Sequence, residues 1–108
     1  MLVVESLKRN FYDENSQKEY FYRLTVKNYE DEDFYGIEIE RHDFEKNNLV
    51  NIEREYMDYV ETDRTKALEL LEMVWENQVS PIHLIDILGA YSDNTIERYS
   101  LNKELFCV

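Results

Sequence analysis

The two histidines are the residues of this sequence best suited to acid–base chemistry. His83 and Asp86 are three residues apart, so on a helix they share one face and the carboxylate can orient the imidazole as a general base. No serine or cysteine has nucleophile spacing near this pair, because Ser80 precedes Pro81 and is better explained as a helix cap. We therefore interpret His83 and Asp86 as the polar stripe of an apolar helix, and we predict no catalytic residue.

A second cluster, His42, Asp43 and Glu45, has the donor atoms of a metal site but not the spacing of one. The acidic run of residues 30–33 lacks the alternation and the glycine of a calcium loop. The single cysteine, Cys107, supplies no zinc-binding set, and two isolated glycines cannot build a phosphate-binding loop. We therefore predict no metal and no cofactor.

Composition limits the class of partner. A chain of 108 residues, of which 44% are hydrophobic, is long enough for a single domain, residues 1–108, with a buried core. A net charge of −12 opposes direct binding to nucleic acid and to a membrane surface of anionic lipid, since both need basic residues. The chain has no apolar run of membrane-spanning length, no signal-peptide pattern and no pair of cysteines, so we expect a cytoplasmic protein.

The negative charge is concentrated in the middle of the chain. Residues 30–63 contain 13 acidic and three basic side chains and so carry −10 of the net −12. The excess begins with the run Glu30–Asp33. Such a run is typical of a solvated loop, and it also suits a docking surface for a basic partner.

Four segments with alternating or β-branched apolar residues predict strands at residues 2–12, 18–28, 34–43 and 49–61. They are joined by short polar turns with no helix between them. Consecutive strands of this kind pair as antiparallel neighbours, so residues 1–61 are predicted to form a four-stranded meander.

The alternation also assigns faces to the strands. Tyr35, Ile37 and Ile39 are expected to face the core, and Glu38, Glu40 and His42 to face water. On the fourth strand, Val50, Ile52, Tyr56 and Val60 are assigned to one face, which leaves Glu53 and Glu55 on the other.

The outer face then becomes a charged ladder in which Arg23 and Lys27 lie beside Glu38 and Glu40, and these lie beside Glu53 and Glu55. The predicted partner-binding residues are Glu30, Asp31, Glu32, Asp33, Glu38, Glu40, Glu53 and Glu55. Reversal of Glu38 and Glu40 to lysine is expected to weaken binding without unfolding the domain.

The hydrophobic period changes at Asp63, which can cap a helix over residues 64–78. Trp75 lies on the broad apolar arc of this helix, and we predict that it is mostly buried. Ser80-Pro81 starts a second helix over residues 81–90, where Gly89 marks an end or a kink. The fold class is therefore α+β, with the meander of residues 1–61 followed by a pair of helices within residues 63–90, packed on one face.

The C-terminal segment, residues 91–108, is left open. Its first part, residues 91–100, either continues the helix or interrupts it. The apolar tail of residues 101–108 is expected to dock on the core or on a partner.

Three stretches resemble a family of small uncharacterised bacterial proteins. They are Asn77–Gly89, with its Ser-Pro-Ile-His-Leu-Ile-Asp core, and the shorter segments Tyr35–Glu40 and Val50–Glu53. The resemblance covers most of the chain and implies a bacterial cytoplasmic protein. It brings no known activity, so it assigns no functional residue.

These observations leave three classes of function. The first, which we predict, is a non-catalytic regulatory or adaptor protein that binds a basic partner protein. The alternative is a nucleic-acid mimic that inhibits a nuclease such as a restriction or CRISPR effector, with rows of carboxylates in place of phosphates. An enzyme built on His83 or His42 would need a pocket that holds the imidazole beside an acid. The sequence leaves open whether the chain forms a homodimer.

Overall fold

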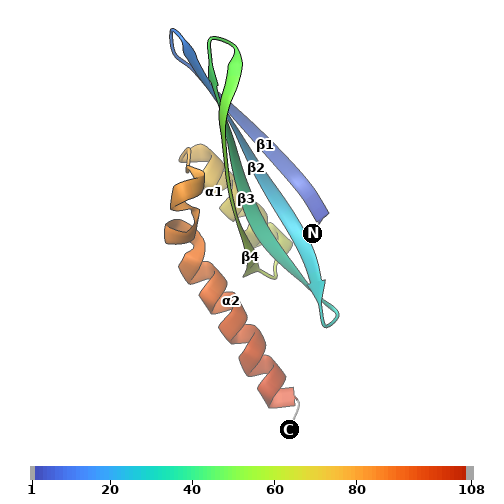
Figure 1. Cartoon of the computed structure of the whole chain (residues 1–108). Coiled ribbons are helices and arrows are strands. Elements are labelled where there is room, and N and C mark those ends of the chain that lie inside the picture. The colour runs from blue at the N-terminus through green and yellow to red at the C-terminus, as the bar shows by residue number, and fades with distance from the viewer. Residues whose placement is uncertain (1, 107–108) are drawn as a thin grey trace.

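The computed structural model describes the backbone of residues 2–106 and the side chains of residues 2–100. Four antiparallel strands in the order β1-β2-β3-β4 precede the helices (Figure 1). The elements are β1 (Leu2–Tyr12), β2 (Ser16–Tyr29), β3 (Glu32–Glu45), β4 (Asn48–Glu61), α1 (Arg64–Glu76), the 3₁₀ helix η1 (Pro81–His83) and α2 (Leu84–Phe106). This confirms the predicted α+β class and the meander.

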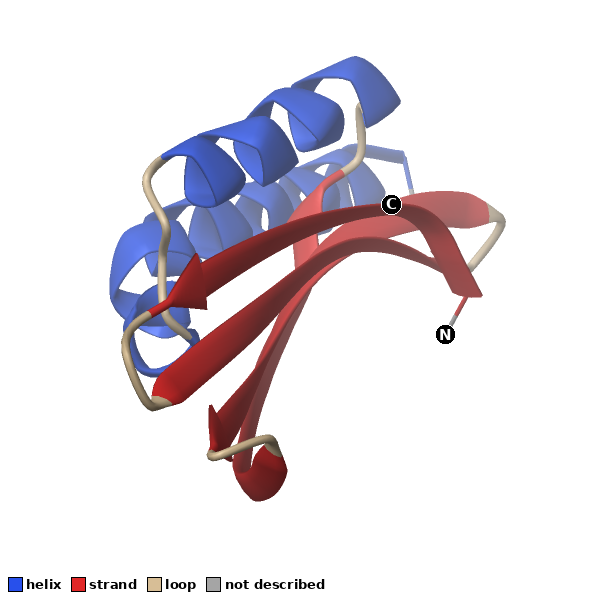
Figure 2. Ribbon diagram, turned by 90° about the horizontal axis from the view of Figure 1, so that it is seen from above, coloured by secondary structure: helices blue, strands red, loops and turns tan. Residues whose placement is uncertain are grey.

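Both helices lie on one side of the sheet, which we call the inner face, and no helix covers the opposite, outer face (Figure 2). The strands are long, and the β1–β2 and β3–β4 hairpins extend past the helices at one end of the molecule (Figure 1). The helices therefore cover the inner face over only part of its length. Where the hairpins extend past the helices, the inner face has no helix to pack against, so apolar side chains gain nothing by pointing toward it.

The core lies where the helices cover the sheet. It is made of alternate residues of β2 and β3 and the apolar sides of α1 and α2: Tyr22, Leu24, Ile37, Ile39, Leu71, Val74, Leu84 and Leu88, all at most 1% exposed. Burial of each such side chain contributes about 1.5–3 kcal/mol. The Tyr22 hydroxyl donates a hydrogen bond to the Val79 carbonyl over 3.0 Å, so this polar group is satisfied inside the core. The predicted inward residues of β3, Tyr35, Ile37 and Ile39, are confirmed as buried.

Two of the hairpins close through two-residue loops with left-handed backbone conformations. Glu30 and Asp31 have φ of 51° and 66°, and Lys46 and Asn47 have φ of 50° and 68°. Positive φ at both central residues is typical of the type I′ turn, whose twist matches that of the flanking strands. The acidic run is therefore part of a tight turn and not of a long loop.

A bulge interrupts β4 opposite Gly36. Tyr35 pairs with Glu61 and Ile37 with Met57, so three residues of β4 face a single residue of β3. Tyr59, in the middle of these three, has a φ of 59°, which is rare for an aromatic residue. A Cβ atom on Gly36 would lie 2.6 Å from the Met57 carbonyl oxygen, so the glycine makes room for the bulged strand.

Helix α1 begins as predicted, with the Asp63 carboxylate accepting a hydrogen bond from the Lys66 amide over 3.1 Å. The prediction that Trp75 is mostly buried is confirmed: its side chain packs against the core, although it is not fully enclosed. Its Nε1 donates to the Lys8 carbonyl over 3.1 Å, and the Arg9 guanidinium lies 5.0 Å from the ring centroid. Trp75 therefore joins the edge of α1 to the edge strand β1.

Helix α2 does not end at Gly89 but continues as one helix to Phe106. Two polar side chains attach it to the bulge of β4, on either side of Tyr59. Ser92 donates to the Asp58 carbonyl over 3.2 Å, and Thr95 donates to the Val60 carbonyl over 2.7 Å. Residues 91–100 therefore continue the helix. The predicted docking of the tail, residues 101–108, concerns side chains that lie outside the described residues.

Candidate partner-binding site at the acidic turn

The outer-face acids are neutralised within the sheet. One guanidinium nitrogen of Arg23 lies 2.6 Å from Glu38 Oε1 and 2.8 Å from Glu40 Oε2. Glu38 is only 5% exposed, and Glu40 is partly buried. The expectation that both acids face water is therefore wrong, because Arg23 from β2 covers them on the predicted face of the sheet.

The electrostatics of this group match its geometry. Burial alone would raise the pKa of Glu40, but the hydrogen bond and charge of Arg23, with a smaller contribution from His42, lower it below its ordinary value. Burial would likewise lower the pKa of Arg23, and its two carboxylate partners raise it. Both shifts favour the charged forms of Glu40 and Arg23. Because the same guanidinium also contacts Glu38, this part of the sheet offers little free negative charge.

The predicted ladder forms only in part: Arg23 lies beside Glu38 and Glu40, but Glu53 and Glu55 do not continue the row. Glu53 pairs with Arg41 and Glu55 with Ile39, which places both acids on the inner face, while Glu38 pairs with Tyr56 and Glu40 with Arg54. Ile52 and Tyr56, which were assigned to the same face as Val60, are 51% and 53% exposed, whereas Val60 is 1% exposed. The physical reason is twofold: the bulge at Tyr59 changes the alternation, and this end of the inner face has no helix above it.

Glu53 and Lys27 also have partners other than those that the predicted ladder gave them. Glu53 forms an ion pair of 3.0 Å with Arg41. Lys27 lies 3.9 Å from Asp58 and stands opposite Phe34 in the strand register, not beside Glu40.

The remaining four predicted residues lie together at one end of the molecule. Glu30 and Asp31 form the β2–β3 turn, and Glu32 and Asp33 begin β3; all four are exposed. Asp33 accepts a hydrogen bond of 3.2 Å from Asn28, which stabilises the hairpin. This acidic turn, residues 30–33, is the part of the predicted surface that presents its carboxylates to solvent as a group.

An aromatic pocket adjoins the acidic turn. Its volume is about 460 Å³, and it is lined by Tyr29, Phe34, Tyr59, Ile96, Tyr99 and Ser100. Tyr29 and Phe34 directly flank the acidic turn in sequence, the bulge of β4 supplies Tyr59, and α2 supplies the other three. Tyr99 donates a hydrogen bond to Glu30 over 2.6 Å, so the turn forms part of the pocket rim.

The rings of this aromatic pocket contact one another edge to face. The Phe34 centroid lies 5.0 Å from that of Tyr59 and 5.1 Å from that of Tyr99, and the centroids of Tyr29 and Tyr99 are 6.1 Å apart. Such contacts hold aromatic rings in defined orientations. Sequence reasoning missed this pocket. The aromatic residues beside the acidic turn were the only sign of it in the sequence. No sequence pattern indicated the bulge that places Tyr59 or the helix turn that places Tyr99.

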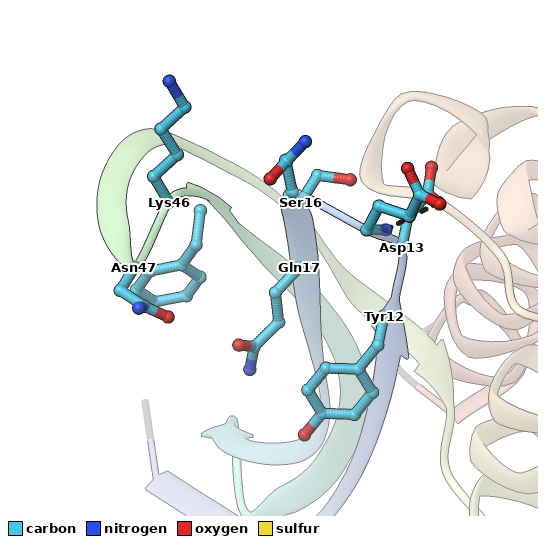
Figure 3. Close-up of a pocket in the computed structure, with 9 residues that line it drawn as sticks. Tyr12, Asp13, Ser16, Gln17, Lys46 and Asn47 are labelled. Carbon is cyan, nitrogen blue, oxygen red and sulfur yellow. Dashed lines mark hydrogen bonds between the residues drawn. The ribbon is translucent and has the colours of Figure 1, made fainter.

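A second pocket, of about 320 Å³, lies at the opposite end of the sheet, between the β1–β2 and β3–β4 hairpins (Figure 3). It is lined mainly by polar turn residues, with Tyr12 and Phe44 as its apolar members, and the Lys46 side chain points away from it (Figure 3). The two turns are joined by a hydrogen bond of 3.0 Å from the Lys46 amide to the Asn15 carbonyl. Unlike the aromatic pocket, this second pocket has neither a wall of several aromatic rings nor a cluster of charges of one sign at its rim.

The structure does not join either histidine to the acids that were grouped with it in the sequence. His83 and Asp86 are both exposed, and no hydrogen bond or ion pair joins them. His42 lies on the outer face, 4.9 Å from the Phe21 ring and 3.5 Å from Glu40, while Asp43 is held on the inner face by Arg41. Within residues 2–100, no three histidine, cysteine or acidic side chains come together in a group that could hold a metal ion.

Comparison with known proteins places the chain in a family without assigning it an activity. A family model described as a family of unknown function (DUF6514) matches residues 1–94, and the chain belongs to this family. No match was found among curated proteins or among solved structures. No helix in the described part of the chain is long and apolar enough to cross a lipid bilayer.

Proposed function

We propose that this member of the DUF6514 family is a non-catalytic adaptor or regulatory protein that binds a partner protein with a basic surface. The observation that carries the proposal is the acidic turn, where four exposed carboxylates adjoin an open pocket with aromatic walls. Aromatic residues are enriched in protein interfaces, and an acidic rim attracts a basic partner over about 8 Å at physiological salt.

The geometry favours a focused docking site over mimicry of nucleic acid. A mimic needs rows of free carboxylates at the spacing of phosphates. Arg23 neutralises Glu38 and Glu40, and Glu53 and Glu55 lie on the opposite face of the sheet. The acidic turn and its pocket cover a small area, which fits recognition of a few basic side chains.

A catalytic role receives less support from the same geometry. A general base needs both an acid that orients it and a cavity that holds its substrate. His83 lines a cavity of about 430 Å³ but makes no bond to Asp86, and the acid beside His42, Glu40 at 3.5 Å, is already paired with Arg23. We further propose the bacterial cytoplasm as the compartment of this protein, because the chain has a single cysteine and resembles small bacterial proteins.

Comparative capture from a bacterial lysate tests this proposal. Three baits are compared: the wild-type full chain, the turn variant Asp31→Asn/Glu32→Gln, and the control variant Glu69→Gln/Glu72→Gln on the exposed side of α1. Both variants remove two carboxylates, so they have the same net charge, and asparagine suits the positive φ of position 31.

We expect mass spectrometry to identify a basic protein that is retained by wild type and by the control but lost from the turn variant. The same protein, once purified, should bind directly to wild type. Equal retention of every captured protein by all three baits would contradict the proposal.

A further inference from the structure

We propose that the aromatic pocket is a binding site for an arginine side chain of the partner. The inference rests on the proposed function and names the group that the partner inserts. It starts from the four aromatic rings that line the pocket, because the faces of aromatic rings carry partial negative charge and attract cations within about 6 Å of the centroid.

One contact within the chain shows that a ring of this pocket accepts a cation. The Lys27 ammonium lies 5.6 Å from the Tyr59 ring centroid. Lys27 is also within 3.9 Å of Asp58, so its charge has a partner of its own on β4. The pocket surface that remains is formed by Tyr29, Phe34 and Tyr99 together with Ile96.

The charge around the pocket favours a cationic occupant over an apolar one. Among the described residues, Glu30 and Glu32 of the acidic turn bring negative charge beside Tyr99, while Lys27 contacts the Tyr59 ring. Glu30 is fixed there by the 2.6 Å hydrogen bond from Tyr99, whose ring is itself a wall of the pocket. A neutral apolar side chain would gain binding free energy by packing against the rings but would not be attracted by these charges.

The shape favours arginine over lysine. A guanidinium is planar, stacks on aromatic faces and donates paired hydrogen bonds to carboxylates, whereas an ammonium is a compact and strongly hydrated charge. A cavity of about 460 Å³ has room for a whole arginine side chain.

The backbone at Tyr59 agrees with a functional pocket. An aromatic residue with φ of 59° stores strain, and such strain gathers at binding sites. The bulge that imposes this conformation turns the Tyr59 ring toward Phe34 and depends on the absence of a side chain at Gly36.

The test is an NMR titration of the full chain with three capped peptides of glycine and serine that differ only at the central residue: arginine, lysine or citrulline. Citrulline has nearly the shape of arginine but no charge. We expect the arginine peptide to shift the ring signals of Tyr29, Tyr59 and Tyr99 and to leave those of Tyr12 unchanged. Lysine should bind more weakly, and citrulline should cause no shift.

Tyr29→Leu removes one wall of the pocket at a side chain that is 48% exposed, so the fold should tolerate it. We expect it to weaken arginine-peptide binding by roughly five- to tenfold. The matched control is Tyr12→Leu, which removes a tyrosine that is 72% exposed at the opposite end of the sheet and should bind the peptide as wild type does.

Three results would overturn the inference. They are equal shifts with citrulline, equal binding of the lysine peptide, and equal affinities of wild type and Tyr29→Leu. If the peptides fail but a basic partner still depends on the acidic turn, the arginine site is wrong and the proposed function stands. If substitutions in the acidic turn leave the affinity for the partner unchanged, the proposed function itself is wrong.

Discussion

The Tyr99 hydroxyl donates a hydrogen bond to the Glu30 carboxylate over 2.6 Å and thereby joins helix α2 to the β2–β3 turn. This bond, with smaller contributions from desolvation and nearby acids, raises the pKa of Tyr99 to about 12 from an ordinary value near 10. The protonated tyrosine is therefore favoured in the folded state. The stability that this bond contributes is present below about pH 10 and is lost as the pH rises through about 12.

The first prediction follows from this bond. Glu30→Gln removes the negative charge, so the pKa of Tyr99 should fall toward 10. The measurement is an NMR titration of the Tyr99 ring carbons in wild type and variant. An unchanged midpoint in the variant would show that Glu30 does not control this group.

Local patterns were sufficient to predict the order of the elements but not the faces of β4. The two-residue period of β2 and the cap at Asp63 predict structure correctly because each depends on neighbours in sequence. The faces of β4 depend on a bulge that Gly36 permits and on the length of sheet that the helices leave uncovered. Neither is a property of β4 alone.

The candidate site likewise has parts that could be predicted from the sequence and parts that could not. The exposure of the acidic turn follows from four consecutive acids, and its place in a hairpin from the strands on either side. The place of Arg23 beside Glu38 and Glu40 was predicted from the alternation of β2 and β3 and is confirmed. The pocket, in contrast, depends on a contact between Glu30 and Tyr99, which are 69 residues apart. Such distant contacts leave no periodic pattern in the sequence.

The second prediction concerns Glu38, which is 5% exposed and paired with Arg23. Glu38→Lys places a second cation beside the guanidinium in a desolvated position, and it should lower the free energy of unfolding by about 3–5 kcal/mol. The structure thus replaces the sequence-based expectation that this reversal leaves the fold intact. Urea denaturation measures the effect.

The control for that experiment is Glu32→Lys in the exposed acidic turn. It should change the free energy of unfolding by less than about 0.5 kcal/mol, because exposed charges contribute little. A Glu38→Lys protein as stable as this control would mean that the Arg23 pair is unimportant to the fold.

The third prediction compares the two glycines. A Cβ on Gly36 would meet the Met57 carbonyl oxygen at 2.6 Å and Thr25 Oγ1 at 2.8 Å, so Gly36→Ala should destabilise the protein by about 1–3 kcal/mol. It should also disturb the bulge and the Tyr59 ring. Thermal and urea denaturation, with NMR of Tyr59, give both effects.

Gly89→Ala is the matched substitution, since the added Cβ would meet no atom within 4 Å apart from its chain neighbours and the nearby backbone of its own helix α2. Alanine should stabilise the protein there by about 1 kcal/mol. Equal effects of the two substitutions would contradict the packing that we assign to Gly36.

The central claim is that the protein binds a basic partner through the acidic turn. Its most direct test is calorimetric titration of the purified partner into wild type, Asp31→Asn/Glu32→Gln and Glu69→Gln/Glu72→Gln, each at low and high salt. We predict that wild type and the α1 control bind equally, that salt weakens both, and that the turn variant binds more weakly and depends less on salt. Equal affinities of wild type and the turn variant at low salt would contradict the account.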